Sequence, residues 1–186
     1  MVKDKEVRAD YDDRHITVYQ AYSPAIAGPA LAAGTFVPPF RPGRMTWVKP
    51  SFLWMMYRCG WGTKEGQERV LAVRITRSGF ESALRAAVLS HDATAVKPEV
   101  RVQWDPERDL HHNPLPHRSL QLGLAGATSA RYVEEWVTGL TDVTPLAHEV
   151  RALVRAGSLD AATARLPVER PYPLPVDLIT HLGASA

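Results

Sequence analysis

The chain has 186 residues, of which 45% are hydrophobic, and its 22 lysines and arginines nearly balance 20 aspartates and glutamates. This length suits one domain with a sizeable core, and the composition excludes a disordered or fibrous chain. Because the net charge is only +2 and the charges are interspersed, we expect no nucleic acid partner. The single cysteine, Cys59, excludes an intrachain disulfide, and the charged start has no apolar signal region, so we expect a cytoplasmic protein without a membrane partner.

The first part of the chain alternates between strand-like and helix-like segments. Runs of β-branched and aromatic residues predict strands, and a serine cap with proline nearby predicts the start of a helix. Pro29 lies inside the first helical segment and favours a break or a turn there. The expected elements are a strand over Ile16–Ala21, a short helix over Ala25–Ala33, a strand over Thr46–Val48 and a helix over Ser51–Arg58.

The rest of the chain changes from strands to helices. Alternating apolar residues predict strands, and apolar residues three or four apart predict amphipathic helices. We expect strands over Glu68–Ile75, Glu99–Trp104 and Ser119–Leu124, a polar loop over Asp105–His117, and helices over Ser78–Leu89, Thr128–Leu140, Val143–Ala156 and Ser158–Leu166.

The order of these elements predicts a single α+β domain with a curved or split antiparallel sheet and a helical C-terminal third. Its expected parts are a polar leader (1–15), a mixed β/α core (16–126), a helical part (127–166) and a proline-rich tail (167–186). The tail is expected to be extended, because proline disfavours regular helix. It could lie across a neighbouring subunit as easily as its own, so a homo-oligomer stays open.

The segment from Met45 to Gly60, MTWVKPSFLWMMYRCG, is the one around which we expect the chain to fold. It contains two tryptophans, three methionines, a phenylalanine and a tyrosine, which require burial. Lys49 falls in the turn between its strand and its helix. An isolated buried ammonium is costly, so Lys49 either extends to water from a core helix or pairs with a carboxylate or a ligand anion.

The polar leader offers a second group of candidate residues. Asp10, Tyr11, Asp12, Asp13, Arg14 and His15 lie just before the first strand. Carboxylates beside a histidine can perform acid–base chemistry, with Asp12 orienting His15, but the same residues are typical of a solvated segment.

A metal site is not expected. Three histidines share the polar loop with three carboxylates, namely His111, His112 and His117 with Asp105, Glu107 and Asp109. Neither an HExxH spacing nor a CxxC pair is present, and adjacent histidines on a loop seldom converge on one ion. The sequence also lacks a GxGxxG loop, a Walker loop and a GxSxG elbow.

Aromatic and polar side chains on otherwise apolar elements predict a pocket for a small organic molecule. These residues are Tyr19, Tyr22, Trp47, Lys49, Trp54, Trp104 and Gln121. The leading hypothesis is a small-molecule enzyme without a cofactor, a lyase or cyclase, with Lys49 as base or oxyanion partner, Tyr19 as acid, and Asp12 and His15 in support. A non-enzymatic binding module is another possibility, and each aromatic residue also fits a plain core position.

Several long segments resemble one family. The runs RADYDDRHITVYQAYSPAIA, MTWVKPSFLWMMYRCGW, QERVLAVRITRSGF, RVQWDPERD and TDVTPLAHEVRALVRAG together resemble the bacterial and fungal domain-of-unknown-function family numbered 4291. The resemblance covers nearly the whole chain and implies no particular activity.

The order of elements is also similar, more distantly, to that of the ADP-ribosyltransferases. This resemblance implies a split sheet that binds NAD, with Tyr19 or Gln20 at the nicotinamide ribose and Ser51 with Trp47 as the middle motif. Arg14, Gln20, Ser51 and Gln121 would then surround the dinucleotide. Gln121 takes the place of the catalytic glutamate and cannot ionise, which puts ADP-ribosyl transfer in doubt.

Overall fold

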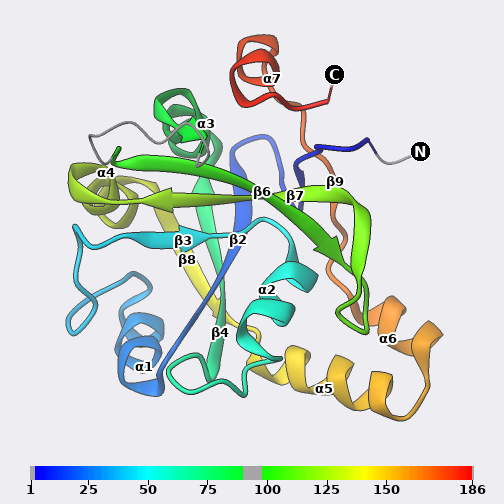
Figure 1. Cartoon of the computed structure of the whole chain (residues 1–186). Helices are drawn as coiled ribbons and strands as arrows, with labels where there is room; N and C mark the ends of the chain where they lie inside the picture. Colours follow the sequence, from blue (N-terminus) through cyan, green and yellow to red (C-terminus); the bar gives the residue numbers. More distant parts are fainter. Residues whose placement is uncertain (1–2, 90–97, 186) are drawn as a thin grey trace.

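The computed structural model describes residues 3–89 and 98–185, and in this part the fold is α+β (Figure 1). The strands are β1 (Arg8–Ala9), β2 (His15–Tyr22), β3 (Thr46–Val48), β4 (Arg69–Thr76), β5 (Val88–Leu89), β6 (Val100–Arg108), β7 (Pro114–Leu124), β8 (Val137–Asp142) and β9 (Arg170–Pro171). The helices are α1 (Pro24–Ala33), α2 (Phe52–Cys59), α3 (Arg77–Ala86), α4 (Gly126–Arg131), a π-helical turn (Tyr132–Trp136), α5 (Thr144–Arg155), α6 (Leu159–Arg165) and α7 (Val176–Leu182).

The strands form three sheets that are antiparallel except for the β5–β6 pair. Their orders are β2-β4-β8, β3-β7-β6-β5 and β1-β9. Figure 1 shows β3, β6 and β7 running across the direction of β2 and β4. The two larger sheets meet at one bridge, where Tyr19 N–H donates to the Lys49 carbonyl at 2.7 Å and Lys49 N–H donates back at 3.3 Å. The expected α+β class and the mostly antiparallel pairing are therefore confirmed, with the strands divided among three sheets.

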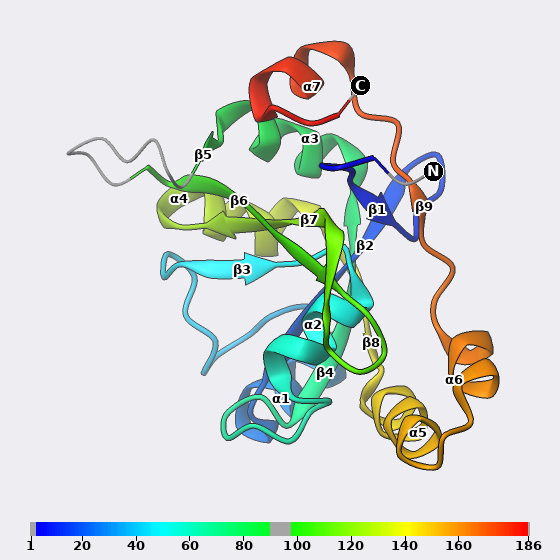
Figure 2. The same ribbon diagram turned by 45° about the vertical axis from the view of Figure 1, so that its right-hand side comes forward.

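Two apolar clusters hold these sheets in place. The larger one includes Ile16 and Val18 of β2 with residues of β4, β6 and β7, and the smaller one joins Tyr19 to α2, α5 and α6. Strand β2 contributes to both clusters because its side chains alternate between its two faces. Figure 2 shows α3 and α7 at the end of the molecule opposite α1, α5 and α6.

The expectation of a helical C-terminal third is wrong, because helices are distributed along the chain. α1, α2 and α3 precede β6, and the expected helix over 128–140 ends at Trp136. The chain then forms β8, which pairs with β4 from Val137 to Asp142. Pairing with the open edge of β4 satisfies the backbone groups of this segment as well as a helix would.

The polar loop expected over 105–117 is also wrong for most of its length. β6 and β7 continue as a long hairpin that leaves only residues 109–113 as a turn. A register shift between Pro106 and Arg108 accommodates the proline, which cannot donate a ladder hydrogen bond. The charged side chains of this segment lack the apolar alternation that predicts a strand, because a hairpin that extends beyond the core has no face to bury there.

Three smaller expectations also change. α1 continues through Pro29 instead of breaking there. The expected helix over 78–89 ends at Ala86, and Val88 and Leu89 form β5. The leader and the tail pair with each other through β1 and β9, and the tail then forms α7 (Figure 2).

Within the described ranges, no helix combines the length and the apolar character needed to cross a membrane.

Candidate functional site

A cavity of about 410 Å³ lies where the sheet divides. Beyond the Tyr19–Lys49 bridge, β2 and β3 separate, and no further backbone bridge joins these two strands in the described residues. We call this cavity the cleft. It is lined by Gln20, Ala21, Tyr22, Met45, Thr46, Trp47, Lys49, Trp54, Met55, Arg58, Gln67, Gln103 and Gln121.

The turn between β3 and α2 fixes the position of Lys49. Ser51 caps α2, because its side-chain oxygen accepts a hydrogen bond from the backbone N–H of Trp54 at 3.1 Å. A second acceptor comes from the tail, where a Glu169 side-chain oxygen accepts a hydrogen bond from the backbone N–H of Phe52 at 2.7 Å. Both interactions satisfy free N–H groups at the start of the helix, so the segment beside Lys49 is held firmly.

Lys49 is a nearly buried cation, only 5% exposed, in the wall of the cleft. Its Nζ lies 5.1 Å from the centroid of the Trp54 ring, a cation–π contact. Among the described residues no carboxylate forms a salt bridge with this ammonium. Burial, together with the nearby Arg58 guanidinium, lowers the pKa of Lys49 to about 8, so a substantial fraction is neutral amine at that pH.

A hydrogen-bond network around Gln20 spans the separated strands. Its amide nitrogen donates to Thr46 Oγ1 at 2.7 Å and to the Tyr22 hydroxyl at 2.9 Å. The amide oxygen accepts a hydrogen bond from the fully buried Tyr132 hydroxyl at 2.6 Å. Burial raises the pKa of Tyr22 to about 12, so this phenol stays protonated at neutral pH. The network therefore holds one side of the cleft in a fixed, neutral arrangement.

Two glutamines on the β6–β7 hairpin form the opposite side. Gln103 and Gln121 are direct cross-strand partners, and both line the cleft. Their amide nitrogens donate to the two oxygens of Asp105, at 3.0 Å and 2.7 Å respectively. Because Asp105 fixes both amides, each can offer its remaining polar atoms to a ligand without reorientation.

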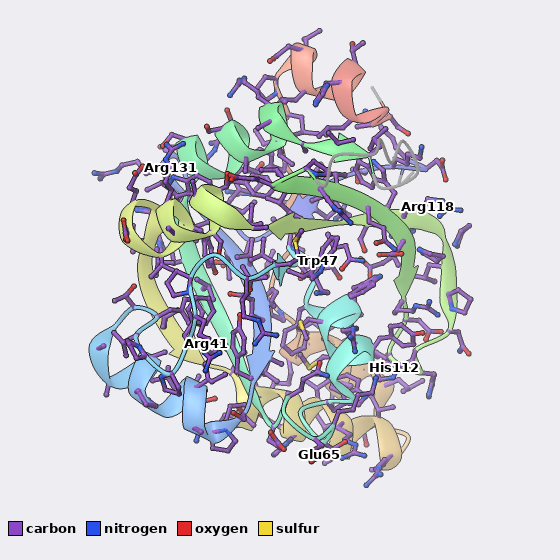
Figure 3. The ribbon with its side chains drawn as sticks, turned by 60° about the vertical axis from the view of Figure 1, so that its left-hand side comes forward. Arg41, Trp47, Glu65, His112, Arg118 and Arg131 are labelled. Atoms are coloured by element: carbon purple, nitrogen blue, oxygen red, sulfur yellow. The ribbon has the colours of Figure 1, made fainter. Side chains whose placement is uncertain are left out.

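The structure brings six of the expected site residues together in the cleft. They are Gln20, Tyr22, Trp47, Lys49, Trp54 and Gln121, and Figure 3 shows Trp47 on β3. Ser51 lies next to them but is buried as the cap of α2.

Tyr19, by contrast, does not line the cleft. Its ring packs edge-on against Phe52 at 5.4 Å in the cluster formed with α5 and α6, and burial raises the pKa of its phenol well above the usual value. Tyr19 and Gln20 are neighbours in a strand, so their side chains point to opposite faces.

The expected acid–base pair of the leader forms, but at the other end of β2. His15 Nδ1 lies 3.3 Å from an Asp12 oxygen, and Asp12 also pairs with Arg74. Backbone N–H groups of Arg14 and His15 lower the pKa of Asp12 to about 2. Neither residue lines the cleft, and the exposed Arg14 does not line it either.

Trp104 also has a different role from the one expected. Its indole N–H donates to the Leu182 carbonyl at 3.0 Å, which attaches α7 to the hairpin.

Sequence reasoning missed four polar residues of the cleft, namely Thr46, Arg58, Gln67 and Gln103. Arg58 follows Trp54 by four positions and so lies on the same face of α2, a spacing that helical periodicity could have revealed. Gln103 lies directly opposite Gln121, but this pairing depends on the register of the hairpin, which the sequence does not state.

The loop histidines do not form a metal site in the described part of the chain. No group of three or more histidine, cysteine, aspartate or glutamate side chains is close enough there to hold an ion. His112 instead stacks on Trp61, with ring centroids 5.2 Å apart, so it attaches the hairpin turn to the end of α2.

Comparison with known protein families identifies the family of this chain. A family model described as a domain of unknown function (DUF4291) matches residues 6–172. No curated protein matches the chain.

Proposed function

Because the chain belongs to the DUF4291 family, whose description gives no activity, we propose its function from the cleft: a small-molecule enzyme that uses Lys49 for acid–base chemistry on an anionic metabolite. The observation that carries this proposal is a nearly buried lysine without a carboxylate partner in the wall of a cavity. A protein gains nothing in stability from such a group, so its retention there points to a ligand.

The charges and amides around Lys49 suit an elimination reaction. Arg58 can bind a substrate carboxylate, and the neutral amine of Lys49 can remove a proton from the adjacent carbon. The electron pair of the broken C–H bond forms a C=C bond as a hydroxyl leaves the next carbon. The lysine ammonium then gives its proton to that hydroxyl, and water is released. One residue thus serves as base and acid, which replaces the acid role expected of Tyr19.

The proposal can be tested before a substrate is known. In protein labelled with ¹³C at the lysine ε-carbons, NMR should show one lysine that titrates near pH 8, and Lys49→Met should remove that signal. A library of hydroxy acids is then assayed for the ultraviolet absorbance of the unsaturated product. Turnover should disappear in Lys49→Met and persist in Lys3→Met, which removes an exposed lysine. A Lys49 signal that titrates above pH 10, or turnover that survives its removal, would refute the proposal.

A second candidate function is NAD binding of the ADP-ribosyltransferase type. The observation that favours it is the open strand edge: Ala21 and Trp47 lie two residues beyond Tyr19 and Lys49 of the bridge, and both line the cleft. Their main-chain groups, with the remaining polar atoms of the Gln121 amide, match the donors and acceptors of a carboxamide. The lining contains no carboxylate to act as the family's glutamate, so this candidate concerns binding rather than transfer.

Thermal unfolding distinguishes the two candidates. A saturable rise in Tm with NAD that Gln121→Ala abolishes would favour the second candidate. No shift with NAD, nicotinamide or ADP-ribose would remove it and leave the hydroxy acids as the substrates to search.

A further inference from the structure

A second cavity adjoins the cleft. It has a volume of about 510 Å³ and shares Tyr22, Met45 and Thr46 with the cleft as common wall. The rest of its lining comes from α1 and from the loop between α1 and β3, namely Ile26, Pro39, Phe40, Arg41 and Arg44. Figure 3 shows Arg41 on this loop. Because three residues line both cavities, the two spaces lie next to each other, and the hydroxyls of the shared Tyr22 and Thr46 are hydrogen-bonded to each other at 2.8 Å.

The charge of the combined lining is one-sided. Lys49 and Arg58 line the first cavity and Arg41 and Arg44 the second, and neither lining includes an aspartate or a glutamate. In the described residues, none of these four cations forms a salt bridge, whereas many other arginines of the protein do. The paired arginines are Arg8, Arg69, Arg74, Arg77, Arg85, Arg131 and Arg165. The nearby carboxylate Asp105, which is bound by Gln103 and Gln121 and acts on the Lys49 charge, offsets only part of this positive charge, so the hollow favours an anionic occupant.

The loop that carries the two arginines is anchored to the core. Phe36 and Phe40 are buried and stacked on each other with ring centroids 4.6 Å apart, and Tyr22 packs edge-on against Phe40. The Gly43 carbonyl accepts a hydrogen bond from the backbone N–H of Gly126 at 3.0 Å. These contacts fix the backbone on both sides of Arg41, while its own side chain stays exposed.

We propose that the two cavities form one elongated site for a small molecule with an anionic group at each end. Lys49 and Arg58 bind one group, and Arg41 and Arg44 bind the other. The groups are phosphates or carboxylates, since guanidinium pairs with either. The inference rests on the proposed function for the Lys49 end, and it adds that the substrate is a long dianion rather than a compact hydroxy acid.

The test compares ligands that differ only in their second anion. Straight-chain α,ω-bisphosphates of increasing length are titrated by calorimetry against the matching monophosphates, and dicarboxylates against the matching monocarboxylates. At the optimal length, the second anion should improve the affinity about tenfold or more, the range expected for charge-assisted hydrogen bonds. The pair of compounds that shows this gain identifies the anion as phosphate or carboxylate.

The variants locate the second anion. Arg41→Gln/Arg44→Gln changes only exposed side chains and should remove the gain in affinity that the second anion gives. Arg14→Gln/Arg155→Gln removes the same charge from exposed positions outside both cavities and should keep the gain. If the second anion adds nothing in either series, or if its gain survives in Arg41→Gln/Arg44→Gln, the inference is wrong.

Failure of the proposed function gives a different result. If Lys49→Met binds every ligand as well as the unaltered protein, the Lys49 end is not an anion site, whatever the two loop arginines do.

Discussion

Replacement of Lys49 by methionine should make the protein more stable at neutral pH. Burial lowers the pKa of Lys49 from 10.5 to about 8 in the folded state. The unfolded chain therefore binds this proton more tightly, and between these two values the free energy of unfolding rises with pH. A shift of roughly 2.5 pKa units corresponds to about 3 kcal/mol, which the folded protein loses in full below pH 8. Methionine fills a similar volume over the Trp54 ring without a charge.

The measurement is thermal or urea unfolding of Lys49→Met at several pH values. At pH 7 the variant should unfold roughly 10 °C higher, since about 1 kcal/mol shifts Tm by roughly 2–4 °C in a chain of this size. The gain should shrink steadily between pH 8 and pH 10.5. Lys3→Met, at an exposed position, should change neither the stability nor its pH dependence.

An unchanged or lower Tm for Lys49→Met at pH 7 would refute this reasoning, because it would mean that the ammonium is solvated or paired in the folded state. The predicted combination of higher stability with lost turnover is typical of a residue retained for function rather than for folding.

Three further predictions test the packing and electrostatics of the rest of the fold. Gly79→Ala should lower the free energy of unfolding by about 2 kcal/mol, because a new Cβ would lie 2.3 Å from the Trp136 ring. Gly28→Ala, in open space on α1, should raise it by about 0.5 kcal/mol. Urea midpoints of the two variants that move in the same direction would contradict this packing. Tyr132→Phe should cost about 1–3 kcal/mol, because it leaves a buried amide oxygen without its donor, and equal denaturation curves would show that the oxygen finds another partner. Burial raises the pKa of Glu169 from 4.5 to about 8, so the folded state binds this proton more tightly than the unfolded chain does. The free energy of unfolding should therefore fall as pH rises from 4.5 to about 8, and Glu169→Gln should make this fall smaller. An unaltered pH profile of stability in Glu169→Gln would disprove this role of Glu169.

Local signals in the sequence were sufficient where short-range interactions decide the structure. The strand over Thr46–Val48 is confirmed, and Ser51 caps the helix that was expected to start there. Helical spacing and a following glycine act within one or two turns, so the sequence states them directly. The expected serine cap of α1 is less accurate, because Ser23 makes no side-chain cap hydrogen bond.

The same local reasoning failed where a distant strand decided the outcome. Val137 and Leu140 fit the spacing of a helix, yet they form β8 because the edge of β4 offers backbone partners. Residues 105–108 are polar, yet they extend β6 because β7 returns beside them. The β4 partner of β8 is far away in the sequence, so no window around β8 reveals it. The partner of residues 105–108 is the next segment of the chain, but the polar sequence of both arms does not state that they pair.

The candidate site shows the same division. Tyr19 lies on the opposite face of β2 from Gln20 and Tyr22, because side chains alternate along a strand. The odd and even positions in the sequence would have predicted this separation. His15 lies about 13 Å from Tyr19 along the strand, too far to act with Lys49.

By itself, the sequence determined the residue types of the cleft and the turn that carries Lys49. It did so because strand, turn and cap are encoded within a few neighbouring residues. Only the tertiary structure decided that β2 and β3 separate after a single bridge and that Gln103 faces the cleft beside Gln121. It alone placed Arg41 and Arg44 next to this cleft. Those facts depend on strand pairing and loop anchoring between distant segments, which the packing of the whole core sets.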